Sequence, residues 1–221
     1  ITDAISPYFV KLYGHGELDK LRNTSILMVK YFGLVFGVAA GILAGLSAPL
    51  LSVWINPSYA ELAPVFIIMM MHLPVNLANV PLFDLIMTYN KVKVPGIVTL
   101  VLGVVNVVMG VFFSLWWGLI GIAIADAVML LVKNTIFTPI YVANFQNLPW
   151  TTYLKPLIPG VIGSFLCLGS GLWISNRFVL DGWMKLIAAA IVIGLAFLVY
   201  AVLVIRNKQE VLSLVKGIRG K

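Results

Sequence analysis

Long apolar runs separated by short polar breaks dominate the pattern of residues along the chain. Each run reaches the roughly 20 residues that a helix needs to cross a bilayer. The breaks contain turn-forming residues, such as Asn-Pro-Ser at 56–58 and the Asn-Lys pair that opens 90–93. We predict spanning helices over residues 30–54, 61–88, 94–116, 118–142, 156–175 and 183–205.

The same runs exclude a β-barrel, because barrel strands alternate polar and apolar residues over segments of about ten. Within lipid every backbone amide needs a partner inside the protein, and a helix supplies that partner within its own segment. We therefore predict an all-α polytopic membrane protein with six transmembrane helices.

The composition supports this class and excludes several others. Hydrophobic residues make up 61% of the 221-residue chain and charged residues only 10%, whereas charged residues are about 25% of an average soluble domain. A soluble enzyme, a disordered chain and a disulfide scaffold are all excluded. The single cysteine, Cys167, has no partner for an internal disulfide.

The charge distribution predicts an orientation. The net charge is +7, and 13 of the 15 Lys and Arg residues lie on one side of the predicted spans. The other side holds Arg177 and Lys185 alone. Because basic loops stay in the cytoplasm, we predict that both termini are cytoplasmic and that the positive charge does not serve nucleic-acid binding.

Four regions follow from these boundaries. An amphipathic surface segment over 5–22, in which Pro7 is expected to open a helix, belongs to the first region. Since the sequence begins at Ile1 and not at Met, we expect a fragment, a processed product or a trimmed chain. The regions are a cytoplasmic connector at 1–29, a four-helix transporter part at 30–145, two additional helices at 146–206 and a basic cytoplasmic tail at 207–221.

The first span carries a stripe of glycines spaced four apart, and small residues on one helix face allow a second helix to approach closely. We predict a helix-packing role, with a sliding surface as the alternative. The stripe consists of Gly33, Gly37, Gly41 and Gly45.

The second span contains polar residues that are costly to place against lipid. His72, Asn76 and Asn79 lie within about 60° of one another around the helix axis. Pro74 and Pro81 each remove a backbone hydrogen bond, and broken helices are tolerated at membrane depth beside protein or water-filled cavities. We predict that the three polar side chains line a substrate cavity; the alternative is that they only hydrogen-bond a neighbouring helix.

Two further polar residues join the predicted cavity. Asn106 lies near the middle of the third span, and Asp126 lies roughly 13 Å deep in the fourth. A carboxylate at that depth is costly unless it is paired, protonated or hydrated. Asp126 is therefore a candidate for ion coupling, and an interhelical bridge is the alternative. Lys133 follows on nearly the same face and is expected to reach the membrane interface.

Asp84 is a second candidate for ion coupling. It lies near the predicted cytoplasmic end of its span, so solvation or pairing with Lys91 is the alternative. Several lysines near the same membrane surface are candidate contacts for phosphate or lipid headgroups. They are Lys30, Lys91, Lys93 and Lys133.

Motifs of enzymes are absent from the sequence. It holds no phosphate-binding glycine-rich loop, no nucleophile–histidine–acid arrangement and no cluster with the spacing of metal ligands. We expect no catalytic residues, no metal and no cofactor, and we predict that the protein is not an enzyme.

Several segments resemble a known family. The stretch SPYFVKLYGHGELDKLR at 6–22 is similar to the cytoplasmic segment before the ninth helix of bacterial polysaccharide flippases, which belong to the multidrug/oligosaccharidyl-lipid/polysaccharide superfamily. The residues at 48–55 and 59–64 resemble the end of that helix and the start of the next. The segment 102–106, which ends at an Asn, followed by the Gly- and Ala-rich 117–126, resembles the most telling motif of the family.

The resemblance implies roughly fourteen helices in two pseudo-symmetric bundles around a central cavity. It implies a bacterial inner-membrane protein that moves an oligosaccharide, linked to undecaprenyl pyrophosphate, to the outer leaflet. Membrane lipid and a missing N-terminal bundle of the same protein would be its partners. Asp126 departs from the Thr or Ser of many relatives. The alternatives are an H⁺- or Na⁺-coupled multidrug extruder of the same superfamily and a non-transporting membrane scaffold.

Overall fold

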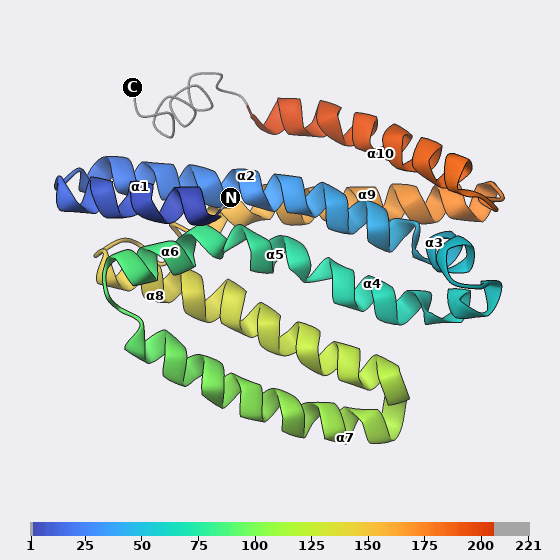
Figure 1. The fold of residues 1–221 in the computed structure, drawn as a ribbon, viewed down its shortest axis with the longest axis horizontal. Helices are drawn as coiled ribbons and strands as arrows, with labels where there is room; N and C mark the ends of the chain where they lie inside the picture. Colours follow the sequence, from blue (N-terminus) through green and yellow to red (C-terminus); the bar gives the residue numbers. More distant parts are fainter. Residues whose placement is uncertain (1, 206–221) are drawn as a thin grey trace.

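The computed structural model describes residues 2–205, with side chains from residue 5 onward. Within that range all regular elements are helices, as predicted (Figure 1). The predicted basic tail at 207–221 lies outside the described residues.

The chain begins with two antiparallel helices, α1 (Thr2–Gly14) and α2 (Leu18–Gly45). Pro7 lies inside α1 and does not open it, which corrects the prediction for this segment. Helix α2 starts well inside the region predicted as a connector at 1–29, because Leu21 and Met28 are buried and no residue between 18 and 45 breaks the helix. The boundary predicted at residue 30 is therefore wrong.

The first predicted span, 30–54, also ends earlier than expected. Helix α2 stops at Gly45, and a separate helix α3 (Ser47–Trp54) follows it. The reason is Pro49, which has no backbone N–H and whose ring would clash with the carbonyl four residues earlier, that of Gly45.

The second predicted span is a series of short helices. The breaks fall at His72 and Asn79, each two residues before a proline, because Pro74 and Pro81 cannot continue the preceding hydrogen-bond ladder. The pieces are the 3-10 helix η1 (Pro57–Leu62) and the helices α4 (Ala63–Met71), α5 (Leu73–Ala78) and α6 (Val80–Thr88).

The third and fourth predicted spans form one helical hairpin. Helix α7 (Lys93–Leu131) reverses direction at Gly118, whose φ of 55° and ψ of −133° suit glycine alone. Its second arm continues through a π-helical turn, η2 (Val132–Phe137), into α8 (Thr138–Phe145). The reversal is visible at the lower right of Figure 1.

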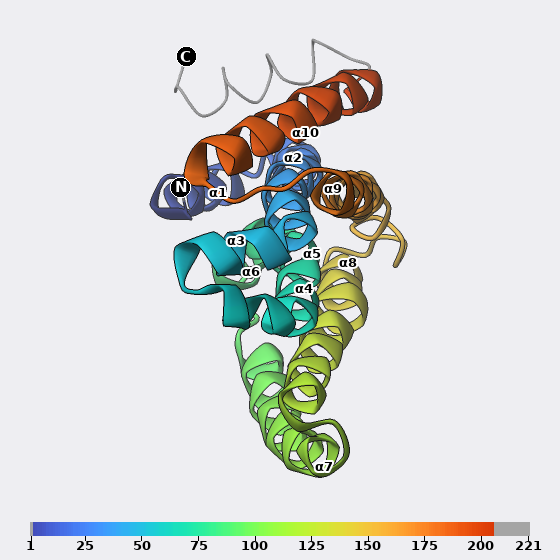
Figure 2. The ribbon, with the colours of Figure 1, turned by 90° about the vertical axis from the view of Figure 1, so that its right-hand side faces the viewer.

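The last two spans follow the prediction closely. A short 3-10 helix, η3 (Lys155–Leu157), leads into α9 (Ile158–Arg177), and α10 (Trp183–Val204) completes the described chain. Figure 2 shows the resulting stack, with α10 over α2 and α9, then α4 to α6, and the α7 hairpin farthest away.

Among residues 2–205, five helical stretches are long and apolar enough to cross a membrane. One of them, Lys93–Phe145, folds back on itself at Gly118 and so supplies two arms. The chain is therefore an all-α polytopic membrane protein. Turns alternate between the two ends in Figure 1: the α1–α2 and α6–α7 turns lie at the left, and the Gly118 reversal and the α9–α10 turn lie at the right.

The glycine stripe faces α9. A Cβ on Gly37 would lie 2.5 Å from the carbonyl oxygen of Gly160, and one on Gly41 would lie 2.5 Å from that of Ser164. Gly33 also faces Gly160, and the final contact pairs Gly45 with Gly171. The two backbones touch along almost the whole of α9, which only glycine permits on the α2 side.

Candidate functional site

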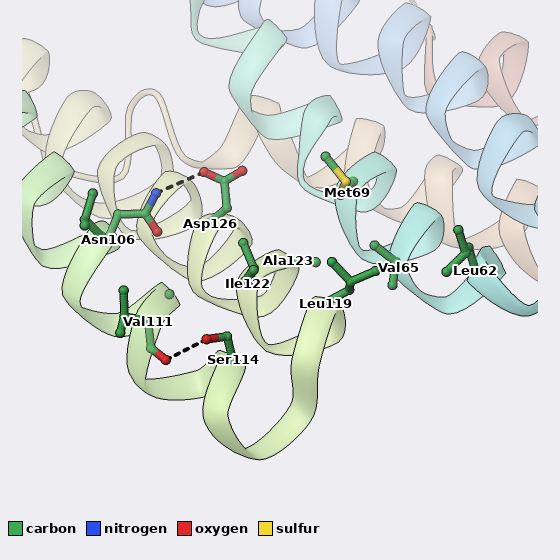
Figure 3. Close-up of a pocket in the computed structure, with 12 residues that line it drawn as sticks. Leu62, Val65, Met69, Asn106, Val111, Ser114, Leu119, Ile122, Ala123 and Asp126 are labelled. Atoms are coloured by element: carbon green, nitrogen blue, oxygen red, sulfur yellow. Dashed lines mark hydrogen bonds between the residues drawn. The ribbon is translucent and has the colours of Figure 1, made fainter.

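The interrupted helix made of η1, α4, α5 and α6 is called the broken helix below. A cavity of about 540 Å³ lies between this broken helix and the α7 hairpin (Figure 3). Residues of η1 and α4 form one wall, and the two arms of α7 form the others. The lining is apolar except for three side chains. Its residues are Leu62, Val65, Met69, Asn106, Val107, Gly110, Val111, Ser114, Leu119, Ile122, Ala123 and Asp126.

The polar face of the cavity is made by Asn106 and Asp126, which come from opposite arms of the hairpin. Asn106 Nδ2 donates to Asp126 Oδ1 at 3.2 Å, as Figure 3 shows. The Asp126 side chain is 42% exposed, so its carboxylate reaches the cavity. Ser114, the third polar residue, donates back to the Val111 carbonyl of its own helix at 2.7 Å. One carboxylate in an otherwise apolar chamber attracts a cation or hydrogen-bond donor.

His72 lies behind Asp126, at the break between α4 and α5. Its Nε2 atom is 3.9 Å from Asp126 Oδ2, and its side chain is only 6% exposed. The break places the imidazole here because Pro74 ends α4 and leaves His72 as the joint between two helical pieces. Lys133, which was expected to reach the membrane interface, places its Nζ atom 5.4 Å from the centre of the Phe83 ring.

A chain of amide side chains leads from His72 into the protein. Asn76 Nδ2 lies 2.7 Å from His72 Nδ1, and Asn134 Nδ2 donates to Asn76 Oδ1 at 2.7 Å. Asn79 Nδ2 donates to the carbonyl of Asn134 at 2.7 Å and to that of Val75 at 2.7 Å. The broken helix is thereby hydrogen-bonded to the π-helical turn η2, a feature that often marks functional sites.

The structure separates the five residues that were predicted to share one cavity. Asn106 and Asp126 line the cavity described above, whereas His72, Asn76 and Asn79 do not. Asn79 is fully buried, with an exposure of 0%. The three residues share a helix face as expected, but that face packs against η2 because Asn134 offers both a side-chain donor and a carbonyl.

The surroundings of Asp84 differ from both alternatives to ion coupling, which were solvation and pairing with Lys91. It is buried, and its Oδ2 atom has no hydrogen-bond partner, whereas Lys91 is exposed. The Lys91 carbonyl instead accepts a hydrogen bond from Tyr141 at 3.0 Å. The predictions of a solvated Asp84 and of an Asp84–Lys91 pair are wrong, because helix α6 turns this residue toward α2 and α8.

The remaining candidate lysines occupy different surroundings. Lys91 and Lys93 are exposed at the α6–α7 turn, where a headgroup is accessible to them. Lys30 is half-buried in α2 and donates to the Val204 carbonyl at 3.4 Å.

Asn134 is the residue that the sequence reasoning missed. It is an amide inside the apolar run of the predicted span 118–142, which is the same signal that singled out Asn106. Among the described residues, no three His, Cys, Asp or Glu side chains are placed to hold a metal ion.

Comparison with known proteins gives one informative relative. The chain is 33% identical over 216 residues to the uncharacterized membrane protein EpsK of Bacillus subtilis (strain 168). The match spans 95% of this chain and 42% of EpsK, so the chain corresponds to less than half of that relative. No family model and no solved structure matches the chain. The relative and the apolar helices together show a multi-pass membrane protein.

Proposed function

We propose that the protein takes part in the translocation of a lipid-linked oligosaccharide across the bacterial inner membrane. The observation that carries the proposal is the cavity between α4 and the two arms of α7, which is apolar apart from Asn106, Ser114 and Asp126. A substrate with a polar head and a polyprenyl tail matches this division. The resemblance to polysaccharide flippases supports this class of cargo, and the relative supports a membrane protein.

In this proposal sugar hydroxyls donate hydrogen bonds to Asp126, while Asn106 holds the carboxylate in place. The polyprenyl tail stays in lipid along the exposed apolar face of the first α7 arm, which includes Val104 and Val108. Lys91 and Lys93 contact the pyrophosphate of the arriving substrate at the cytoplasmic surface. A second bundle of the same protein completes the cavity wall.

A multidrug extruder is the second candidate, and the carboxylate favours it. Asp126 faces an apolar chamber and has His72 and Asn106 as its neighbours, an arrangement that suits a lipophilic cation. Such a substrate needs the negative charge of Asp126, whereas an oligosaccharide needs only its hydrogen-bond acceptors.

The two candidates differ in which compound protects the cavity from chemical labelling. In the full-length protein, with Cys167→Ser, single cysteines replace Val111, which lines the cavity, and Val108, which is on the same arm but outside it. A membrane-impermeant maleimide should label Val111→Cys at least tenfold faster. Undecaprenyl-pyrophosphate-linked oligosaccharide should slow that labelling, and a lipophilic cation should not. Protection by the cation alone would replace the flippase with the extruder.

The proposed orientation has a separate test. Both termini are taken as cytoplasmic from the distribution of Lys and Arg. Reporter fusions after Asn90 and Arg177 should report the cytoplasm and the outer side. The opposite result would place Lys91 and Lys93 outside and remove their proposed contact with the arriving substrate.

A further inference from the structure

The buried amide network holds three oxygen atoms without a hydrogen-bond partner: Asn79 Oδ1, Asn134 Oδ1 and Thr138 Oγ1. Two of them are amide oxygens, which only accept, whereas the Thr138 hydroxyl can also donate. Buried polar atoms without partners are rare and costly, so these three call for an explanation.

The hydrogen bonds of the Asn79 amide fix its orientation. Asn79 Nδ2 faces two carbonyl oxygens, which only accept, so the Asn79 amide cannot be reversed. Asn76 presents its nitrogen to His72 Nδ1 and its oxygen to Asn134 Nδ2. With the Asn76 and Asn134 amides in this orientation, His72 Nδ1 is an acceptor and the proton of the neutral ring is on Nε2, which faces Asp126.

A second proton on His72 disturbs this arrangement. The ring then carries N–H at Nδ1 as well. This N–H faces the Asn76 nitrogen, which is also a donor, so the Asn76 amide must turn over to present its oxygen. Its nitrogen then faces the nitrogen of Asn134, which must turn over in its place. The Asn134 oxygen, which has no partner in the structure, then accepts from the Asn76 nitrogen.

We propose that His72 and Asp126 form a proton-binding pair, and that proton uptake by His72 reverses the Asn76 and Asn134 amides and so rewrites the hydrogen bonds between the broken helix and the π-helical turn. The proton comes from water, the new bond is Nδ1–H, and the positive charge of the imidazolium is balanced by the Asp126 carboxylate, whose Oδ2 atom lies 3.9 Å from Nε2. The inference goes beyond the proposed function and holds for either cargo.

Asp126 is the charged group that acts on His72. Helices α4 and α5, which flank His72, pack against α2, η1, α6, α7, η2 and α9. Other charged side chains on these elements do not face the imidazole: Asp19, Lys20, Arg22, Lys30, Glu61, Asp84, Lys93, Lys133 and Arg177.

The mechanical consequence lies at η2. A π-helical turn is a strained insertion whose hydrogen bonds are easily rearranged. Asn134 is inside that turn, and α8 continues directly from it. Proton uptake by His72 therefore changes the hydrogen bonds of η2, which follows the second α7 arm in the chain.

The chain holds two histidines, which makes the test direct. With ¹⁵N-histidine and the exposed His15 changed to Gln, nitrogen NMR of the protein in lipid nanodiscs reports His72 alone. We expect a proton on Nε2 and none on Nδ1 near neutral pH, and protons on both nitrogens in acid. A ring protonated at Nδ1 near neutral pH would overturn the proposal.

The coupling to η2 is measured with a fluorine label. In the Cys167→Ser protein, a trifluoromethyl label is placed at Ile136→Cys, on the exposed side of η2, and at Val199→Cys on α10 as the control. The signal at 136 should change with the same midpoint as His72 protonation, and the signal at 199 should not. Protonation of His72 with no change at 136 would refute the coupling.

A substitution at Asn134 separates the switch from a passive bridge. In Asn134→Asp both oxygens accept, so Asn76 must present its nitrogen to them and its oxygen to His72. The Nδ1 atom should then be protonated already near neutral pH, whereas Asn144→Asp, an exposed change on α8, should leave Nε2 protonated alone. If Asn134→Asp does not fold, Asp126→Asn should lower the doubly protonated fraction several-fold at a given pH. An unchanged ring in the variant that folds contradicts the proposal.

Discussion

Two interfaces of the molecule are held together in different ways. One joins α2 to α9, and the other joins the broken helix to the α7 hairpin. On one side α2 packs against α9 through glycines, with backbone against backbone and almost no polar side chains between them. On the other side the broken helix meets the α7 hairpin through His72, Asn76, Asn134 and Asp126, next to a cavity. Close backbone packing permits one arrangement, whereas a network with unpartnered acceptors permits more than one. We infer that α2 and α9 form the fixed part of the molecule and that the hairpin moves against it.

The largest effect should come from the fixed side. Gly37→Leu places a side chain against the carbonyl of Gly160, and neither backbone can yield, so we expect a loss of about 3 kcal/mol or more. Folded protein recovered by size-exclusion chromatography should fall severely. Gly103→Leu is the matched control, because nothing lies within 4 Å of a Cβ there. Normal folding of Gly37→Leu with lost transport would mean that the glycine stripe takes part in movement and not in fixed packing.

The hairpin turn gives the next effect. Gly118→Ala forces an L-residue into φ 55° and ψ −133°, at a cost of about 1–3 kcal/mol. Gly103→Ala, in the helical part of the same arm, should instead be neutral or stabilising, because alanine is the better helix former. Thermal unfolding in detergent measures both. Equal stability of the two variants would mean that the reversal at Gly118 is not required by the hairpin.

A substitution at Asp126 tests the interface of the α7 hairpin without disturbing the contact between α2 and α9. Asp126→Asn keeps the size of the side chain and replaces one acceptor oxygen with a donor, so folding should be retained while transport falls about tenfold, or about 1.4 kcal/mol. Asp181→Asn is the control, since Asp181 is exposed and bound to Lys185 at 2.7 Å outside the cavity. Undiminished transport by Asp126→Asn would take the carboxylate out of the mechanism.

The smallest effect concerns a contact that joins the two sides. Tyr153 is fully buried, and its hydroxyl lies 3.1 Å from Ser25 Oγ of α2 and donates to Gln146 Oε1, just after α8, at 2.9 Å. Tyr153→Phe should cost about 1 kcal/mol. Ser170→Ala, an exposed hydroxyl on α9, should cost less.

The same tyrosine predicts a pH dependence. Burial raises the pKa of Tyr153 to about 12, above its usual value near 10. Since the folded state holds the proton more tightly, this contribution to stability is complete below pH 10 and is lost as the pH rises toward 12. Alkaline unfolding of Tyr153→Phe should therefore be less steep over that interval than that of the native chain. Identical curves would assign the alkaline transition to other groups.

The sequence predicted those site residues whose side chains are costly to place in lipid without a partner. Asp126, His72 and Asn106 were identified because a carboxylate, an imidazole and an amide each need a partner at membrane depth. The partners themselves were not predictable. Asp126 lies 3.9 Å from His72 of the broken helix, and Lys133 lies 5.4 Å from the centre of the Phe83 ring.

The sequence by itself indicated which segments are long and apolar enough to cross a membrane, because hydrophobic length is a local property. Proline and glycine act on their own backbone and so mark helix breaks, although the break before Pro49 was not predicted. Only the tertiary structure decided which polar residues meet. It paired Asn134 with Asn76, buried Asn79 and Asp84, and left Asp126 facing a cavity. Those outcomes depend on how helices distant in sequence are rotated against one another, and no local pattern of residues records that rotation.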